Sequence, residues 1–222
     1  MASDPVGPRI TYYNDGTGER IELSTVTLAN WAAKTGNLLR DELGAGPSSR
    51  VAVMLPAHWQ TAAVLFGIWW IGAQVVLGGD ADIALCTADR LPEADDAVGA
   101  GEIAVLSLDA FGKPVADLPV GVTDYATSVR VHGDQISPER HPSPALDGRS
   151  VSEVLAGAQA SAAAQGFTAD DRVLSTARWD TGDELTDNFL AVLAAGASLV
   201  QVANPDGSVL DRRRQTEKVT RG

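Results

Sequence analysis

Two continuous apolar runs separated by a helical segment constrain the fold of this chain more than any other feature of its sequence. The runs are residues 51–55 and 72–77, and the segment between them, 58–71, is apolar on nearly every side. Apolar runs without alternation are typical of parallel strands that are covered on both faces. Parallel neighbours need a crossover connection, which a helix supplies here. The sequence therefore predicts a strand–helix–strand unit with a right-handed crossover.

Similar elements lie on both sides of this unit. Residues 14–18 (NDGTG) predict a β-hairpin, because Asn, Asp and Gly tolerate the positive φ of tight turns. The other expected strands are residues 10–13, 20–23, 83–86, 103–108, 172–175 and 198–202. The other expected helices are residues 25–43, 151–165 and 183–195, with Ser24 or Thr25 as the cap of the first. The alternation predicts an α/β fold, a mostly parallel sheet flanked by helices, in a single domain over residues 1–222.

Two segments interrupt the pattern. Residues 132–150 contain Pro138, Pro142, Pro144 and the turn Asp147-Gly148, and they predict a long irregular connection. Residues 204–222 are polar and are predicted to form a frayed tail.

Charge and composition exclude several classes of function. The net charge of −12 argues against nucleic acid and anionic membrane as partners, because both are polyanions. The most apolar segment, residues 62–73, is shorter than the ~20 residues that a membrane-spanning helix needs. The start of the chain lacks the pattern of a signal peptide. The single cysteine, Cys86, lies in an apolar run and is expected to be buried and inert, which fits a reducing, cytoplasmic location.

Three stretches carry a resemblance to a known family. They are residues 28–56, which include LANWAA and RVAVMLP, residues 72–76 (GAQVV), and residues 166–200, which include GFTADDRVLS and LAAGASLV. In this order they resemble the amino-terminal part of the adenylate-forming superfamily, the acyl-CoA synthetases and their relatives. The resemblance is closest to short actinobacterial relatives that lack the ATP-phosphate loop. It implies the fold of a truncated amino-terminal domain.

The residues that would bind ATP phosphates are missing from the matching place. Members of the superfamily use a loop rich in Ser, Thr and Gly, followed by Pro-Lys-Gly, ahead of the helix that precedes the Asp-Asp-Arg strand. The corresponding segment here is residues 131–150, VHGDQISPERHPSPALDGRS. Phosphates need inward-facing backbone N–H groups and a cation, but this segment has two isolated glycines, three prolines and no lysine. The chain has no lysine at all between Lys113 and Lys218.

Other parts of the superfamily's chemistry are absent as well. An aromatic-His pair lines the acyl pocket after the matching strand, whereas residues 177–180 (ARWD) contain no histidine. The motifs for adenine, magnesium and ribose, and the catalytic lysine of the small domain, would lie beyond Gly222. Adenylation needs all of these groups at once. We therefore assign no catalytic, cofactor-binding or metal-binding residue, and expect no cofactor.

Two groups of titratable side chains have a structural interpretation. The potential metal ligands His132, Asp134, Glu139 and His141 lie in the proline-rich segment, which offers no fixed geometry, so we interpret them as a solvated loop. Asp170-Asp171 has the form of an acid–base pair but is also ordinary at a helix-to-strand turn, which we prefer. The sequence does not exclude a nucleophile–His–acid triad, for which three histidines are available.

The tryptophans of the apolar helix are expected to be structural. Trp59 and Trp70 are spaced to share one face and are predicted to lie in the core or at a subunit interface, while Trp69 points elsewhere.

The sequence predicts a non-catalytic protein-interaction or self-associating module. Two alternatives remain: a protein that binds an acyl or nucleotide ligand, and an enzyme completed by a second polypeptide. A homodimer is expected because strand 198–202 is as apolar as a fully covered strand, yet the chain ends soon after it. In the alternative, residues 138–144 fold over that face and the protein is a monomer.

Overall fold

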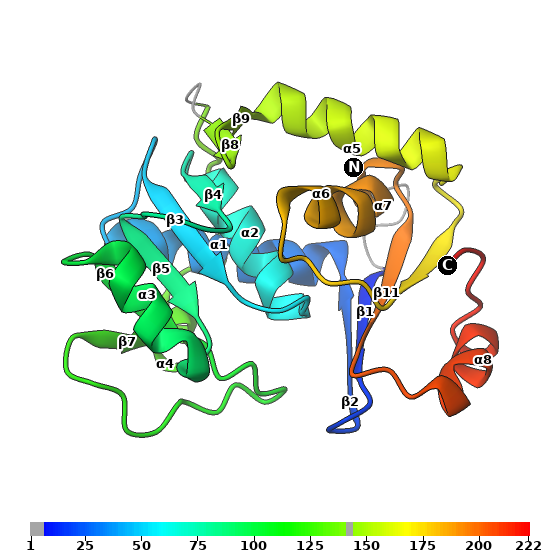
Figure 1. Cartoon of the computed structure of the whole chain (residues 1–222), viewed down its shortest axis with the longest axis horizontal. Helices are drawn as coiled ribbons and strands as arrows, with labels where there is room; N and C mark the ends of the chain where they lie inside the picture. Colours follow the sequence, from blue (N-terminus) through cyan, green and yellow to red (C-terminus); the bar gives the residue numbers. More distant parts are fainter. Residues whose placement is uncertain (1–6, 141–143) are drawn as a thin grey trace. The chain divides into compact units, whose positions relative to one another are not determined.

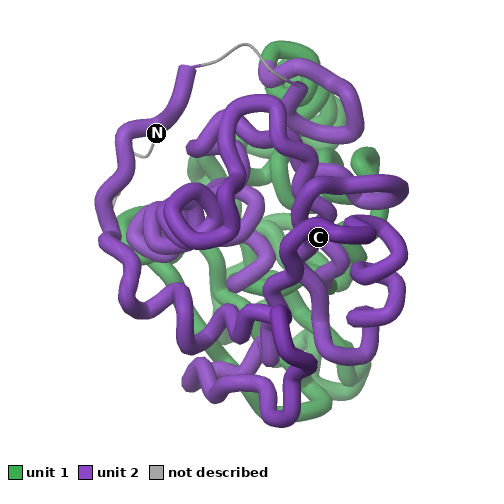
Figure 2. The backbone as a smooth tube through the Cα atoms, turned by 90° about the vertical axis from the view of Figure 1, so that its left-hand side faces the viewer, with its two compact units in different colours: residues 1–27, 56–59, 152–222 green, residues 28–55, 60–151 purple. Residues whose placement is uncertain are grey.

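The computed structural model describes residues 7–140 and 144–222 of the protein. The backbone divides into two compact units (Figure 2). Each unit contains its own sheet. Unit 1 comprises residues 1–27, 56–59 and 152–222, and unit 2 comprises residues 28–55 and 60–151. The single domain over residues 1–222 stays a prediction.

Unit 2 contains a seven-stranded sheet in the order β7-β6-β5-β3-β4-β8-β9 (Figure 1). All neighbouring strands are parallel except β8 and β9, which are antiparallel. The predicted strand–helix–strand unit is confirmed as β3, α2 and β4. The strands are β3 (Arg50–Met54), β4 (Gln74–Val76), β5 (Ile83–Cys86), β6 (Glu102–Val105), β7 (Val122–Asp124), β8 (Pro144–Leu146) and β9 (Arg149–Ser150).

The central strands of unit 2 are buried on both faces, as their uniform apolar character predicted. Helix α3 (Leu91–Val98) covers one face, where its Ala94 and Val98 pack against alternate residues of β3, β5 and β6. Helices α1 (Thr25–Asp41) and α2 (Trp59–Trp70) lie on the other face (Figure 1). The shorter elements are η1 (Ala88–Arg90), α4 (Tyr125–Ser128) and η2 (Val129–Val131).

Unit 1 contains a four-stranded sheet in the order β10-β11-β1-β2. The predicted hairpin is confirmed, since β1 (Pro8–Asn14) and β2 (Glu19–Ser24) are antiparallel. The two remaining strands, β10 (Arg172–Ser175) and β11 (Ser198–Ala203), pair in parallel. The helices are α5 (Val151–Gln165), the consecutive turns α6 (Gly182–Leu185), η3 (Thr186–Leu190, a π-helix) and α7 (Ala191–Ala194), and α8 (Gly207–Thr216). Two mostly parallel sheets flanked by helices confirm the α/β class.

Local sequence signals account for where two helices begin. Ser24 Oγ accepts the backbone N–H of Thr27 at 3.1 Å and so caps α1, as predicted. Thr181 and Glu184 form a capping box at α6, in which each side chain accepts a backbone N–H of the other residue.

The prediction of a frayed tail over residues 204–222 is wrong. Helix α8 is followed by Glu217, which is buried, and the N–H of Thr220 donates to Arg172 O at 2.9 Å. Leu210 and Val219 pack against a small apolar cluster made of Leu174, Val200 and Val202. The apolar face of β11 is therefore covered in part by the same chain. The homodimer expected from this strand stays a prediction.

The buried and apolar side chains singled out in the sequence have mixed outcomes. Trp59 is buried, so its predicted place in the core is confirmed, whereas Trp70 is only half-buried. Cys86 is fully buried, and burial raises the pKa of its thiol to about 11, which confirms an inert thiol. Among the described residues, no helix has both the length and the apolar character needed to cross a membrane.

Candidate functional site

Residues 144–150 form a β-hairpin in the segment to which the sequence resemblance assigns the phosphate loop. Strand β8 pairs with β4 on one side and with β9 on the other. Asp147 and Gly148 have φ of 46° and 82°, the positive values that a type I′ turn requires at both positions. The N–H of Asp147 donates to Val75 O, and its Oδ1 accepts the N–H of Leu77, both at 3.0 Å. The predicted turn is confirmed, but the irregular connection is shorter than 132–150 because two strands occupy its end.

The segment before the hairpin presents carbonyl oxygens to helix α1. Lys34 Nζ donates to His132 O at 2.7 Å. Asn37 Nδ2 donates to Gly133 O at 2.8 Å and to Gln135 O at 3.0 Å. An anion cradle needs inward N–H groups, and carbonyl oxygens have the opposite polarity. Lys34 thus brings a positive charge to this segment, a contact that the sequence did not predict. Its ammonium group donates to a backbone carbonyl oxygen there.

Three of the four potential metal ligands, His132, Asp134 and Glu139, lie in the part of the chain that the structure describes, and there they form no metal-binding group. His132 Nε2 lies 3.1 Å from Glu42 Oε2, and the backbone N–H of Glu139 donates to Trp70 O. His141 lies outside the described residues. Across residues 7–140 and 144–222, no three His, Cys, Asp or Glu side chains are placed to hold a metal ion.

His58 is the histidine that the structure places deepest. It precedes α2, is 2% exposed, and packs edge-on against Tyr12 with a ring separation of 4.3 Å. Burial lowers the pKa of His58, although Glu19 acts in the opposite direction. At this exposure the imidazole is shielded from solvent, and it packs against Tyr12.

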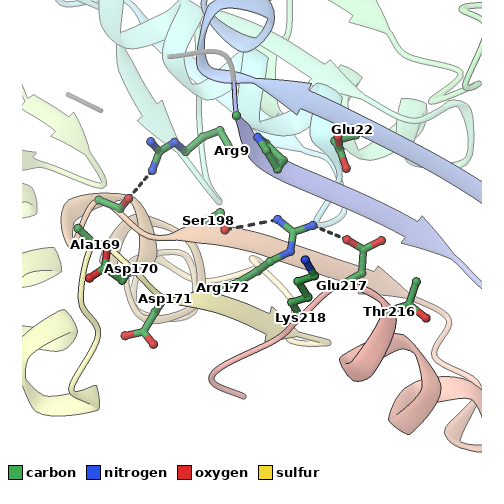
Figure 3. Close-up of a pocket in the computed structure, with 13 residues that line it drawn as sticks. Arg9, Glu22, Ala169, Asp170, Asp171, Arg172, Ser198, Thr216, Glu217 and Lys218 are labelled. Carbon is green, nitrogen blue, oxygen red and sulfur yellow. Dashed lines mark hydrogen bonds and ion pairs between the residues drawn. The ribbon is translucent and has the colours of Figure 1, made fainter. Parts of the chain in front are cut away.

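A surface pocket of about 500 Å³ lies in unit 1 (Figure 3). Arg9 lines it and donates to Gly196 O at 2.6 Å and to Ala197 O at 2.7 Å. None of the described residues that line it is a histidine or a cysteine. Its charged lining residues are Arg9, Glu22, Asp170, Asp171, Arg172, Glu217 and Lys218.

An ionic network centred on the buried carboxylate of Glu217 forms one wall of this pocket. Arg172 donates to Glu217 and to Ser198 Oγ (Figure 3). It also donates to Thr11 Oγ1 at 2.8 Å. The other oxygen of Glu217 accepts from Tyr13 and from Arg20, the latter at 3.0 Å. Burial alone raises the pKa of Glu217, but the hydrogen bonds from Tyr13, Arg172 and Arg20 outweigh it and lower the pKa to about 2. These side chains therefore hydrogen-bond to one another, and we interpret this wall of the pocket as part of the structural framework of unit 1.

The pair Asp170-Asp171 is a turn, as the sequence interpretation preferred. Asp171 accepts from Thr220 Oγ1 at 2.6 Å, from the N–H of Thr168 at 2.8 Å and from its hydroxyl at 2.9 Å. These hydrogen bonds, that from Thr220 foremost, lower the pKa of Asp171 to about 2. A carboxylate held ionised at neutral pH by three partners has no proton to donate and is a poor base.

No protein-family model matches the chain. A TIGR03089 family protein of Mycobacterium tuberculosis is 72% identical over 226 residues, which cover 100% of this chain and 93% of that protein. The chain belongs to the TIGR03089 family. This agrees with the actinobacterial relatives that the resemblance implied.

Solved structures show the fold of this TIGR03089 family member. The acyl-CoA synthetase of Brucella canis matches 98% of the chain with a TM-score of 0.80 and 18% identity. The N-terminal domain of FACL13 from Mycobacterium tuberculosis matches 95% of it with a TM-score of 0.66 and 18% identity. The chain spans 44% and 57% of these two structures, respectively. It therefore has the fold of the amino-terminal part of acyl-CoA synthetases, and at this identity the likeness concerns the fold alone.

Proposed function

We propose that this chain is a non-catalytic relative of the adenylate-forming enzymes that acts as a protein-interaction or self-associating module in the cytoplasm. One observation carries the proposal. The segment that would bind ATP phosphates is instead a β-hairpin, and the N–H of Asp147 within it is hydrogen-bonded to the neighbouring strand β4.

The chemistry of adenylation explains why this difference matters. A carboxylate attacks the α-phosphate only when the charge that builds up is neutralised by fixed donors and cations. The hairpin contributes to a sheet, and the residues ahead of it direct carbonyl oxygens at Lys34 and Asn37. The helices and strands of the fold are kept, whereas the carbonyl oxygens of this segment have a polarity that opposes phosphate binding.

A ligand-binding protein is the second candidate function. The pocket of about 500 Å³ in unit 1 has a volume suited to a small molecule. Such sites are mostly apolar, however, whereas this pocket is lined by charged groups, of which Arg172 and Glu217 bind each other and Arg9 binds a backbone carbonyl oxygen. A thermal-shift screen with ATP, acyl-AMP analogues and CoA separates the two functions, because a ligand that binds the native state raises its melting temperature. The same screen, repeated with cell extract, probes for an enzyme completed by a second polypeptide.

The isolated protein is expected to show no ATP–pyrophosphate exchange with any carboxylic acid. The physical reason is that the described segment ahead of α5 lacks a phosphate cradle. The measurement is radiolabelled exchange on purified protein, with an active acyl-CoA synthetase as the assay control. Exchange above background that disappears in Lys34→Met would overturn the proposal, because Lys34 is the cation that contacts this segment.

A further inference from the structure

Residues 217–222 lie along the edge of the sheet in unit 1, next to β10. The N–H of Thr220 donates to Arg172 O, and the N–H of Leu174 donates to Arg221 O, both at 2.9 Å. The pairing forms a parallel bridge outside the regular strands. Backbone hydrogen bonds to a sheet edge are one of the ways in which binding domains hold an extended peptide. The structure therefore shows this edge with a peptide segment of the same chain bound to it.

Two side chains of the segment fit polar positions on the rest of unit 1. The carboxylate of Glu217 accepts hydrogen bonds from three donors, Tyr13, Arg20 and Arg172. The ion pair with Arg172 is visible in Figure 3. Thr220 Oγ1 donates to Asp171 Oδ1 at 2.6 Å and accepts the N–H of Arg172 at 2.9 Å. The segment thus binds through a carboxylate and a hydroxyl three positions later, the pattern Glu-x-x-Thr.

The surface that receives this pattern is called here the β10 groove. It consists of the β10 edge and four side chains, Tyr13, Arg20, Asp171 and Arg172. Its two guanidinium groups stand in a chain with a net charge of −12. They select a carboxylate, because hydrogen bonds between two charged groups are about twice as strong as neutral ones.

The contact between the segment and the groove is mostly polar. No residue of helix α8, which leads to the segment and is red in Figure 1, is buried. Leu210 and Val219 supply the apolar part of the contact. Charged and hydroxyl groups that separate on opening regain hydrogen bonds to water. Segments with few buried apolar contacts open at a lower free energy than the core does.

The connection between β11 and α8 can serve as the hinge for such an opening. It consists of residues 204–206, and Asn204 has a φ of 48°. Hinges are a few loop residues that absorb a large change of φ and ψ. A change in these residues moves residues 207–222 away from the groove while β11 keeps its pairing with β1 and β10.

We propose that the β10 groove is the recognition site of the interaction module and that its ligand is an extended Glu-x-x-Thr segment of a partner protein. Residues 217–222 then act as an autoinhibitory contact, because they occupy the groove until such a segment replaces them. The inference rests on the proposed interaction function and names its site and the chemistry of its partner.

Effective concentration and charge favour a partner protein over a second copy of this chain. A second copy offers the same segment that the groove already holds. The tethered segment has the higher effective concentration, so the copy gains nothing by replacing it. Two copies of net charge −12 also repel each other. A different protein can present the pattern with a better fit.

The test is the fluorescence anisotropy of a labelled, capped peptide with the sequence of residues 215–222, QTEKVTRG, added to the 222-residue chain. The unaltered chain should bind it weakly, because only the open fraction of the chain is competent to bind. Glu217→Ala in the protein loosens the segment and keeps the groove, and should tighten binding at least ~10-fold. The peptide should also raise the melting temperature of this variant, because it supplies the missing carboxylate. Thr220→Ala, a milder change, is the second variant if Glu217→Ala does not fold.

A second peptide, QTQKVTRG, separates recognition from general charge attraction. It lacks the carboxylate and is more positive, so attraction to an acidic chain alone would make it bind more tightly. Recognition by the groove should make it bind at least ~10-fold more weakly. Arg20→Met in the loosened chain should reduce the difference between the two peptides. Arg178→Met is the matched control, because it removes the same charge from a side chain that is 79% exposed and outside the groove.

Three outcomes would contradict the proposal. A folded, loosened chain that binds neither peptide, or binds both equally, refutes the β10 groove while the proposed interaction function stands. A loosened chain that doubles its mass in sedimentation equilibrium and leaves the peptide unbound has a second copy as its occupant, which refutes a partner segment. The absence of adenylation is judged separately by the exchange assay.

Discussion

Replacing Glu217 with alanine is expected to lower the free energy of unfolding by about 3–5 kcal/mol, the usual cost of removing one partner of a buried ion pair. Glu217 is 8% exposed and is bound by Tyr13, Arg20 and Arg172. Without the carboxylate, Arg172 stays buried with its positive charge uncompensated. Urea unfolding followed by tryptophan fluorescence measures the change as a lower midpoint at an unchanged slope.

Glu93→Ala is the matched control for this variant. Glu93 pairs with Arg90 at 2.7 Å, but both side chains are exposed, and exposed pairs contribute at most about 1 kcal/mol. If Glu217→Ala and Glu93→Ala unfold at the same urea concentration, the network around Glu217 does not hold the end of the chain. Glu217→Gln separates charge from shape, since its amide keeps the size and loses the ion pair.

The same network predicts how stability responds to acid. The pKa of Glu217 is about 2 in the folded protein, below its ordinary value of 4.5. A depressed folded pKa contributes stability that is fully present above the unfolded pKa and is lost as pH falls toward the folded pKa. Stability should therefore fall between pH 4.5 and 2, and Glu217→Gln should fall less steeply. Asp171, whose pKa is also about 2, keeps part of the slope in that variant.

The interior of the fold could be predicted from sequence because its signals are local. Apolar runs such as residues 51–55 identify covered strands, and positive-φ pairs such as Asp147-Gly148 identify turns. Each signal lies within a few residues of the element it describes. The ordered end of the chain could not be predicted in this way. The partners of Glu217 are Tyr13 and Arg20 near the start and Arg172 on β10, and no local pattern in a polar segment reveals them.

The same distinction between local signals and long-range contacts applies to the candidate sites. The sequence alone shows that residues 131–150 lack the residue types of a phosphate loop, because phosphate binding demands particular residue types in consecutive positions. The hydrogen bond from Lys34 to His132 O could not be predicted from the sequence, because it depends on how α1 packs against a segment far along the chain. The exposure of Phe111 could not be predicted from the sequence either. An isolated phenylalanine in a loop carries no sign of which way it faces. The backbone of this residue is held by its N–H, which donates to Asp109 Oδ1, and by its carbonyl oxygen, which accepts from Arg130.

Replacing Gly67 with alanine is expected to destabilise the protein by about 1–3 kcal/mol, the usual cost of overpacking a filled core. Gly67 lies in helix α2, where α2 meets α1 within unit 2. A Cβ at this position would lie 2.9 Å from Ala32 O, from Gly36 N and from Thr35 Cβ. Two of these three atoms belong to the backbone of α1, so no side-chain rotation relieves the clash. The two helices have to separate, which loosens the layer behind the seven-stranded sheet.

The sign of this effect is informative, because alanine is the better helix former. In a helix interior, Gly→Ala by itself stabilises by roughly 0.5–1 kcal/mol. Gly157 in α5 is the matched control, since a Cβ there would come no closer than 3.8 Å to Thr186 Cγ2. Gly157→Ala should therefore raise the urea midpoint, while Gly67→Ala should lower it. The two substitutions share the same change in helix propensity, so the difference between them isolates the contact between α1 and α2. Equal shifts in the two variants would show that these helices are not in close contact at Gly67.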